Sequence, residues 1–407
     1  MSSKLKNVLR KLKKNYYDIC AIKHLRKLQK NCNSGPVVFI CQFESVWNKS
    51  EAVYLTLKER KCEVKLLVVK DKTKFDGDKT LFERKYPEDV VLYEEGILDK
   101  LKPSLVMYSR PYESLLPKDI QASSAIKKCK TGFIPYYYSL ENDYSFSISY
   151  EFIRNICLFF ADQKATQDYF NDSYPKNIKQ GLQKSFNVGY PALEATIEKV
   201  ESNEPKLNLY KNNNRCKVMW TPRWTTDERI GGSNFLKYYK QLFELMNNND
   251  KYSFLFRPHP MLFDNFLENK YITKEEYENL INLISNSTNM FYDKTSEYFD
   301  TFCNTDILIS DNSSIIVEYL LTGKPMIYCF NKSNFVFNEI MNELLECNYV
   351  VDNWEELVKV LNDLHDGKDY KKESRMKLVA RLKDENLQAS SKIADSIVNN
   401  IESKKSN

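Results

Sequence analysis

One short segment of this chain combines a phosphate-binding side chain with a rigidly held imidazole. The sequence has only three histidines, and His259 lies between two prolines in Arg257-Pro-His-Pro260. Proline restricts the backbone, so the direction of the imidazole is fixed at little entropic cost. Such an imidazole can donate to a phosphate, or act as a general acid or base near neutral pH. Arg257 adds a guanidinium that can bind phosphate through two parallel N–H groups.

A second segment, Ser-Asp-Asn-Ser-Ser at positions 310–314, precedes an apolar stretch of helical character. Ser, Asp and Asn are favourable residues at a helix start, and the free backbone N–H groups there attract anions. We therefore expect Ser310, Asp311, Ser313 and Ser314 to contribute to a phosphate site. Glu318, one turn further on, is a candidate acceptor of hydrogen bonds from a ribose.

Short apolar runs must position these residues, and each run is predicted to be a buried strand. They lie at residues 36–41, 64–69, 90–93, 105–108, 217–220, 252–256, 289–292, 306–309 and 325–329. Strands of this kind, alternating with helical patterns, predict parallel sheets covered on both faces. Ligands of such sheets bind beyond the carboxyl ends of the strands. Arg223, in the loop 221–228, then joins the two segments above in one predicted cleft.

The order of the elements predicts an α/β fold of two Rossmann-type domains facing a central cleft. We place the first domain at residues 35–200 and the second at residues 201–370. A basic helical segment (1–34) precedes them, and a charged helical tail (371–407) follows.

The first thirty residues carry ten Lys or Arg and one acid, a charge of +9, while the whole chain has a net charge of +5. Apolar residues recur among these cations at helical spacing, at Leu5, Val8, Leu9, Leu12, Tyr16, Ile19 and Leu25. A basic amphipathic helix suits an anionic membrane surface, although it could also pack on the domain. The remaining residues are net negative, which argues against a nucleic-acid partner.

Cysteine usage favours a reducing compartment. The ten cysteines are scattered, without a C-x-x-C pair. No run of eighteen apolar residues and no secretory signal is evident. We therefore expect a cytoplasmic protein, held peripherally on the cytosolic face of the cell membrane.

Three motifs together resemble the CDP-glycerol glycerophosphotransferase family, which includes teichoic acid primases and polymerases of GT-B architecture. They are Arg223-Trp224 after a strand, the RPHP segment, and SDNSSIIVEYLLTGKPMIYC from position 310. The resemblance covers residues 216–332. It implies that Arg257, His259, Ser313 and Ser314 hold the donor pyrophosphate. It also implies a CDP-alditol donor on the second domain, a lipid-linked or polymeric glycan acceptor on the first, and release of CMP.

The sequence departs from the family at a second, catalytic histidine expected in the first domain. No histidine occurs between His24 and His259, and the corresponding segment, 132–142, reads GFIPYYYSLEN. Glu141 is our first candidate for the missing base. The alternatives are three tyrosines and two aspartates, namely Tyr136, Tyr137, Tyr138, Asp227 and Asp311.

Two other functions are compatible with these motifs. Bacterial sialyltransferases and related nucleotide-sugar enzymes also carry HP and SS motifs and release CMP. The acidic motif that supplies the catalytic base of those sialyltransferases is not found, and the most similar sequence in this chain is Phe75-Asp-Gly-Asp78. A non-catalytic scaffold is the third possibility. No D-x-D triplet lies between apolar strand residues, so we expect metal-independent transfer with no cofactor.

Overall fold

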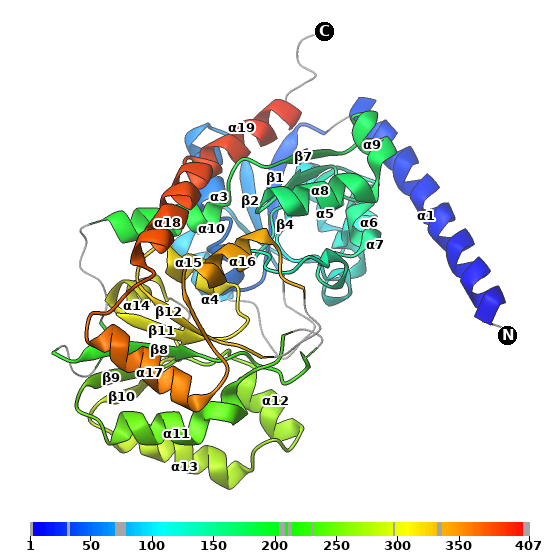
Figure 1. Cartoon of the computed structure of the whole chain (residues 1–407). Coiled ribbons are helices and arrows are strands. Elements are labelled where there is room, and N and C mark those ends of the chain that lie inside the picture. Colours follow the sequence, from blue (N-terminus) through cyan, green and yellow to red (C-terminus); the bar gives the residue numbers. More distant parts are fainter. Residues whose placement is uncertain are drawn as a thin grey trace. The chain divides into compact units, whose positions relative to one another are not determined.

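The computed structural model describes residues 3–30, 33–69, 79–202, 208–210, 214–228, 231–295, 298–331 and 336–401 (Figure 1). The acidic sequence at 75–78 lies outside these ranges, as do residues 203–207 and 211–213 near the predicted domain boundary. The chain forms two compact units. The N-terminal unit comprises residues 1–139, 143–194 and 386–407, and the C-terminal unit comprises residues 140–142 and 195–385.

The N-terminal unit is built on a seven-stranded sheet in the order β3-β2-β1-β4-β5-β6-β7, with every recorded strand pair parallel. The strands are β1 (Gly35–Cys41), β2 (Val64–Val68), β3 (Val90–Leu92), β4 (Pro103–Tyr108), β5 (Lys130–Phe133), β6 (Leu158–Phe160) and β7 (Lys184–Phe186). The central strands β1 and β4 are buried along almost their whole length. Such burial is typical of a parallel sheet covered on both faces.

Helices precede, connect and follow these strands. They are α1 (Ser3–Lys30), α2 (Glu44–Trp47), α3 (Glu51–Glu59), α4 (Lys79–Lys85), α5 (Ile97–Leu101), α6 (Ala122–Ala125), α7 (Tyr150–Ile153), α8 (Lys164–Ser173), α9 (Pro175–Lys179) and α10 (Pro191–Glu201). Three 3₁₀ turns span Glu113–Leu115, Lys118–Ile120 and Tyr144–Phe146. Asn48, Lys49 and Ser50 form a turn that separates α2 from α3.

The predicted N-terminal helix is present as α1, and its C-terminal end lies beside α9 (Figure 1). Leu25 and Leu28 are buried there, and Asp18 accepts a hydrogen bond from Tyr174 at 3.1 Å. Asp18 also pairs with the buried Arg154 at 3.3 Å. The amphipathic stripe is not shown: Leu12, Tyr16 and Ile19 are exposed, and the side chains of Leu5, Val8 and Leu9 lie outside the described residues. Within the described ranges, no helix is long and apolar enough to cross a membrane.

The C-terminal unit contains a six-stranded sheet in the order β10-β9-β8-β11-β12-β13, again with parallel pairs. Its strands are β8 (Cys216–Thr221), β9 (Tyr252–Phe256), β10 (Met290–Tyr292), β11 (Ile307–Ser310), β12 (Met326–Cys329) and β13 (Tyr349–Val351). Its helices are α11 (Phe235–Asn247), α12 (Leu262–Glu268), α13 (Lys274–Asn286), α14 (Phe299–Asn304), α15 (Ile315–Leu320), α16 (Glu339–Glu346), α17 (Trp354–His365) and α18 (Lys372–Asn386). Side-chain caps fix the starts of several, as Thr273 and Glu276 do in a reciprocal pair on α13.

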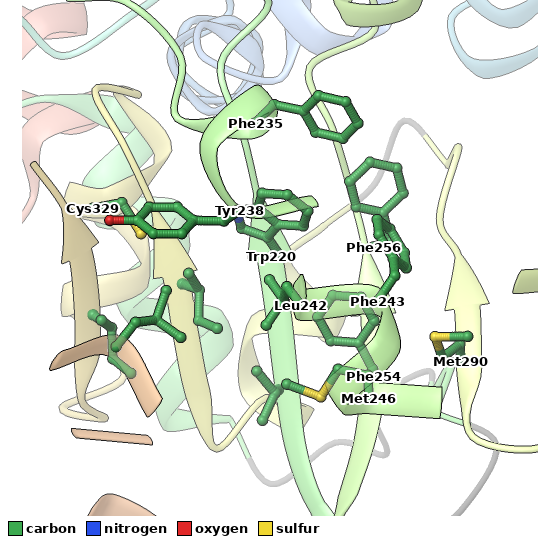
Figure 2. Close-up of a cluster of buried hydrophobic side chains, with 14 of the residues drawn as sticks. Trp220, Phe235, Tyr238, Leu242, Phe243, Met246, Phe254, Phe256, Met290 and Cys329 are labelled. Carbon is green, nitrogen blue, oxygen red and sulfur yellow. The ribbon is translucent and has the colours of Figure 1, made fainter. Parts of the chain in front are cut away.

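An aromatic core supports the strands that lead to the candidate site (Figure 2). Trp220 on β8 stacks on Phe235 of α11, with ring centroids 5.4 Å apart and planes at 14°. Phe243 meets Phe256 of β9 edge to face at 5.0 Å. All four rings are almost fully buried, so the last residues of β8 and β9 rest on a close-packed base.

The end of the chain returns to the N-terminal unit as α19 (Ala389–Ile401), which packs on α3 (Figure 1). Ile393 and Ile397 are fully buried there. Arg60, directly after α3, donates to the carbonyl oxygen and the hydroxyl of Ser391 at 3.0 and 2.8 Å. Residues 389–401 thus complete the core of the N-terminal unit.

Replacing Ile397 by Ala should lower the free energy of unfolding by about 2–4 kcal/mol, because it leaves a cavity between α19 and α3. Urea unfolding followed by circular dichroism measures this change. The matched control is Lys392→Ala, an exposed position of the same helix. Equal stability of the two variants would contradict the docking of α19.

Candidate functional site

The structure brings the three predicted segments together at the carboxyl edge of the C-terminal sheet. Their strands are neighbours, since β8 lies between β9 and β11. The backbone N–H of His259 donates to the carbonyl oxygen of Pro222 at 3.1 Å. The backbone N–H of Arg223 donates to Oδ1 of Asp311 at 2.8 Å. These bonds hold the loops after β8, β9 and β11 against one another.

Asp311 is the centre of this arrangement. Its second oxygen, Oδ2, accepts the backbone N–H of Asn234 at 3.0 Å and the hydroxyl of Ser233 at 3.3 Å. Ser310 makes a similar link, because its hydroxyl bonds that of Thr221 at 2.8 Å. Both side chains are almost completely buried. Asp311 and Ser310 therefore position the loops and the start of α11, and do not present their side chains to solvent.

Burial raises the pKa of Asp311 to about 6. The hydrogen bonds from Asn234 and Arg223 act in the opposite direction and do not fully compensate. Ionising Asp311 in the folded protein therefore costs more free energy than ionising a carboxyl group in water.

His259 follows β9 at the edge of the site. Its Nδ1 accepts the backbone N–H of Met261 at 3.2 Å, which assigns the proton to Nε2. The imidazole lies 6.2 Å from the indole of Trp224, centroid to centroid, with the planes at 43°. The side chain is exposed. The Nε2–H group is therefore available as a donor to a ligand.

Surrounding protein atoms and the nearby Arg223 guanidinium lower the pKa of His259 to about 4. The lowered pKa means that His259 is neutral near neutral pH. It can donate a hydrogen bond to a phosphate, but it does not supply the positive charge.

Arg223 supplies positive charge beside His259. Its Nη1 donates to the carbonyl oxygen of Asn312, in the loop after β11. This bond directs the guanidinium across the ends of β8 and β11.

Arg257 was expected to bind phosphate, but its guanidinium contacts protein groups instead. Its guanidinium pairs with the fully buried Asp293 and donates to the carbonyl oxygen of Thr295 at 2.8 Å. It also lies over the ring of Tyr298, with 5.3 Å between the guanidinium carbon and the ring centroid. Asp293 directly follows β10. The end-of-strand rule that selected the other loops selects this position too, so the sequence held a signal for it.

Glu318 is buried on α15, and its Oε2 accepts a hydrogen bond from the hydroxyl of Tyr298 at 2.6 Å. Tyr298 thus links Glu318 to Arg257, and sequence reasoning missed it. Through these contacts, Arg257 and Glu318 hold Asp293, Thr295 and Tyr298 in place.

Ser313 and Ser314 lie between β11 and the six-residue helix α15. Ser314 has helical dihedral angles, and its side chain does not cap the helix, in contrast to the expected N-cap. Both residues are half-buried, and in the described part of the chain no hydrogen bond of either hydroxyl is recorded. These two hydroxyls are therefore the polar groups of this loop that are least engaged with other protein groups.

The candidate bases are in separate places. Glu141 belongs to the C-terminal unit, where it forms an antiparallel bridge with Phe337, and its Oε2 accepts the backbone N–H of Leu140 at 3.2 Å. Tyr136, Tyr137 and Tyr138 belong to the N-terminal unit, and Tyr138 is buried. Asp227 is half-buried in the loop after β8. Across the described ranges, no three His, Cys, Asp or Glu side chains are grouped to hold a metal ion.

Comparisons with known proteins agree with this architecture. A sequence profile of CDP-glycerol:poly(glycerophosphate) glycerophosphotransferases matches residues 159–399. A search of curated protein sequences finds no match. The wall teichoic acid polymerase TagF has a similar structure, with a TM-score of 0.57, 15% identity, and coverage of 99% of this chain and 98% of TagF.

Two epimerase structures are also similar. The putative UDP-N-acetylglucosamine 2-epimerase of Listeria monocytogenes gives a TM-score of 0.59 at 13% identity, covering 91% of this chain and 97% of its own. The UDP-GlcNAc 2-epimerase of Neisseria meningitidis gives 0.55 at 13%, covering 89% and 99%. At such identities the likeness shows the fold alone, and it confirms the predicted GT-B-like α/β class.

The raised pKa of Asp311 predicts a pH-dependent stability that Asp311→Asn should lack. The folded pKa of about 6 exceeds the ordinary value of 3.8, so the protonated form stabilises the fold. That contribution is fully present below pH ~4 and is lost as the pH rises through ~6. The stability difference between wild type and variant should therefore fall by roughly 2 kcal/mol from pH 4 to pH 7.

Urea unfolding of both proteins across this pH range measures the difference. Asp250→Asn, at an exposed position, is the control. A constant difference between wild type and Asp311→Asn would show that Asp311 titrates normally.

Proposed function

The chain belongs to the CDP-glycerol:poly(glycerophosphate) glycerophosphotransferase family, and from that premise we propose how it transfers glycerol phosphate and to what. It is a CDP-glycerol glycerophosphotransferase-like transferase. The acceptor we propose is a polymeric or lipid-linked glycan of the cell surface. One observation carries the assignment of the site: the RPHP loop and the Ser-rich loop flank Arg223 at adjacent strand ends.

In the proposed reaction, an acceptor hydroxyl attacks the phosphorus that bears the glycerol. The bond from that phosphorus to the bridging oxygen breaks, and CMP leaves with the electron pair. Negative charge grows on the CMP phosphate as this bond breaks. Donors held in place before the reaction are well suited to stabilise such charge.

We assign those donors to His259, Arg223 and the hydroxyls of Ser313 and Ser314. His259 donates from Nε2, since its Nδ1 already accepts the Met261 N–H. Arg223 contributes the positive charge that a neutral imidazole lacks. Asp311, Ser310, Arg257 and Glu318 act as positioning residues, because their recorded partners are protein groups.

The proton of the attacking hydroxyl must pass to a base, and we propose Glu141. Its carboxylate replaces the histidine that the family resemblance leads us to expect in this segment. The bridge to Phe337 fixes its backbone, so its position depends on the C-terminal unit.

We further propose that α1 brings the enzyme to the cytosolic face of the membrane. Leu12, Tyr16 and Ile19 are exposed on this helix among its cations. Lys14 lies over the ring of Tyr150 at 5.0 Å, so part of the basic surface is held close to the N-terminal unit. Exposed cations attract anionic lipid, and apolar side chains can then enter the interface.

Replacing His259 by Ala should lower turnover by about two to three orders of magnitude, because one preorganised donor is lost. CMP release from CDP-glycerol, with and without an acceptor, measures this. His24→Ala, in α1, is the matched control and should behave as wild type. We expect both rates to be unaffected by excess EDTA.

In the same assay, Glu141→Gln tests the base, since the amide cannot take the proton. A wild-type rate in His259→Ala would refute its role, and a wild-type rate in Glu141→Gln would remove Glu141. Loss of all activity in EDTA would overturn metal independence. Thermal unfolding of each variant separates these effects from misfolding.

Deleting residues 2–16 should abolish flotation with anionic vesicles at low salt and leave the melting temperature unchanged. The deletion removes six of the ten cations of the segment and keeps Asp18, Leu25 and Leu28, which attach α1 to the unit. Binding by the full chain should decline as salt rises, because exposed charges are screened within about 8 Å at physiological ionic strength. Equal flotation of both proteins would exclude α1 as the membrane contact.

A further inference from the structure

A buried aspartate of the N-terminal unit repeats the arrangement of Asp311. Asp162 comes two residues after β6, and its Oδ2 accepts the backbone N–H of Ser139 at 2.7 Å. Ser139 belongs to the loop that follows β5, the strand paired with β6. Asp311 likewise accepts a backbone N–H of the loop after β8, the strand paired with β11. In both units, a buried carboxyl group after one strand therefore holds the loop of the neighbouring strand.

The carboxyl group of Asp162 is enclosed by protein groups. Its side chain is almost completely buried, and its Oδ1 accepts a hydrogen bond from the hydroxyl of Thr166 on α8. The next residue, Gln163, donates from Nε2 to the carbonyl oxygen of Ser139. Two consecutive residues therefore hold Ser139 through its N–H and C=O groups. Burial raises the pKa of Asp162, as it does for Asp311, so this role does not require a full negative charge.

Tyr190 holds the earlier part of the same loop. Its hydroxyl donates to the carbonyl oxygen of Pro135 at 3.0 Å, and its ring centroid lies 5.8 Å from that of Tyr138. Both rings are buried, and the backbone N–H of Tyr190 donates to Oδ1 of Asn386 at 2.7 Å. Residues 135–139 are thus held at several points within the N-terminal unit.

Glu141, the proposed base, comes two residues after this loop. On its other side the backbone is held within the C-terminal unit, where the N–H of Asn142 donates to the carbonyl oxygen of Val336 at 2.9 Å. Glu141 therefore lies between two fixed points of the chain, at Ser139 and at Asn142. A base acts only where its carboxylate is within hydrogen-bond reach of the proton that it takes. The supports of this segment should therefore affect the rate of transfer.

We propose that Asp162 is a positioning residue of the transfer reaction, which orients Glu141 through the backbone of Ser139. Tyr190 supports the same loop at its earlier end. The inference rests on the proposed function, because it takes Glu141 as the base. Loss of either support widens the range of positions that Glu141 occupies, which slows the chemical step and leaves donor binding unchanged.

The first test measures CMP release from CDP-glycerol in the presence of acceptor. Asp162→Ala should lower kcat by about tenfold to a hundredfold, because a small misplacement of a catalytic group has effects of this size. The KM for CDP-glycerol should stay at the wild-type value, since the assigned donor ligands belong to the C-terminal unit. Asp162→Asn keeps an acceptor for the Ser139 N–H and should restore most of the rate. Asp168→Ala, at an exposed position of α8, is the matched control.

A second variant tests the loop with its packing retained. Tyr190→Phe removes one hydroxyl and keeps the ring, so kcat should fall by about threefold to tenfold, as expected for one hydrogen bond. A double-mutant cycle then separates positioning from a general loss of structure. If Asp162 acts through Glu141, Asp162→Ala should lower kcat no further in a Glu141→Gln background.

Hydrogen exchange followed by mass spectrometry measures the loop without the reaction. Peptides that cover residues 134–142 should exchange faster in Asp162→Ala and Tyr190→Phe than in wild type, because their backbone supports are lost. Asp162→Asn should exchange at close to the wild-type rate. Peptides from β8 should be unchanged in all variants, which would exclude global unfolding.

The outcomes separate the positioning role from the function. Unchanged exchange of residues 134–142 in Asp162→Ala would overturn the proposal, and so would effects of Asp162→Ala and Glu141→Gln on kcat that multiply. If Asp162→Ala does not fold, Tyr190→Phe in the same cycle decides whether the loop acts through Glu141. If wild type releases no CMP from CDP-glycerol, the proposed function fails, and the exchange rates still decide whether Asp162 holds the loop.

Discussion

The Asp311 carboxylate joins three segments that are far apart in the sequence, and the geometry of the donor loops follows from it. Asp311 comes directly after β11, Arg223 lies in the loop after β8, and Asn234 precedes α11. The bonds are to backbone N–H groups, so they fix the path of the chain and not only a side chain. Removing a buried acceptor of this kind leaves several donors unsatisfied, which costs more than the bonds themselves contribute. The directions of Arg223 and of the serine-rich loop that follows Asp311 therefore depend on the Asp311 side chain.

A second buried carboxylate has a complementary task. Asp293 holds the guanidinium of Arg257, while Asp311 is surrounded by backbone N–H groups and a hydroxyl. One charge is thus neutralised by a cation, and the other is only solvated by dipoles, which agrees with the raised pKa of Asp311. Between them lies His259, neutral and with Nε2–H unused by the fold. The site combines rigid supports with a few uncommitted donors, as binding of a charged leaving group requires.

Sequence patterns located the strands that carry these loops and missed several others. The strand at 252–256 has its predicted bounds, because its residues are apolar and polar neighbours flank it. By contrast, β5, β7 and β13 have only three or four residues, and the first two contain Lys, Thr or Ser. The position of Asp293 relative to Arg257 depends on the pairing of β10 with β9, which no local pattern reveals. Burial separates Asp311 and Glu318 from the binding role expected of them, and burial is a property of the folded chain.

Because α19 packs on α3, the N-terminal unit cannot be completed until late in the synthesis of the chain. The ribosome delivers α3 long before residues 389–401 exist, so the apolar surface that receives Ile393 and Ile397 stays uncovered while most of the chain is made. A nascent chain can fold its C-terminal sheet before its N-terminal core is complete. The N-terminal unit is therefore complete only once residues 389–401 have been made, and a chain that lacks them would have an exposed, aggregation-prone face on its first-made half.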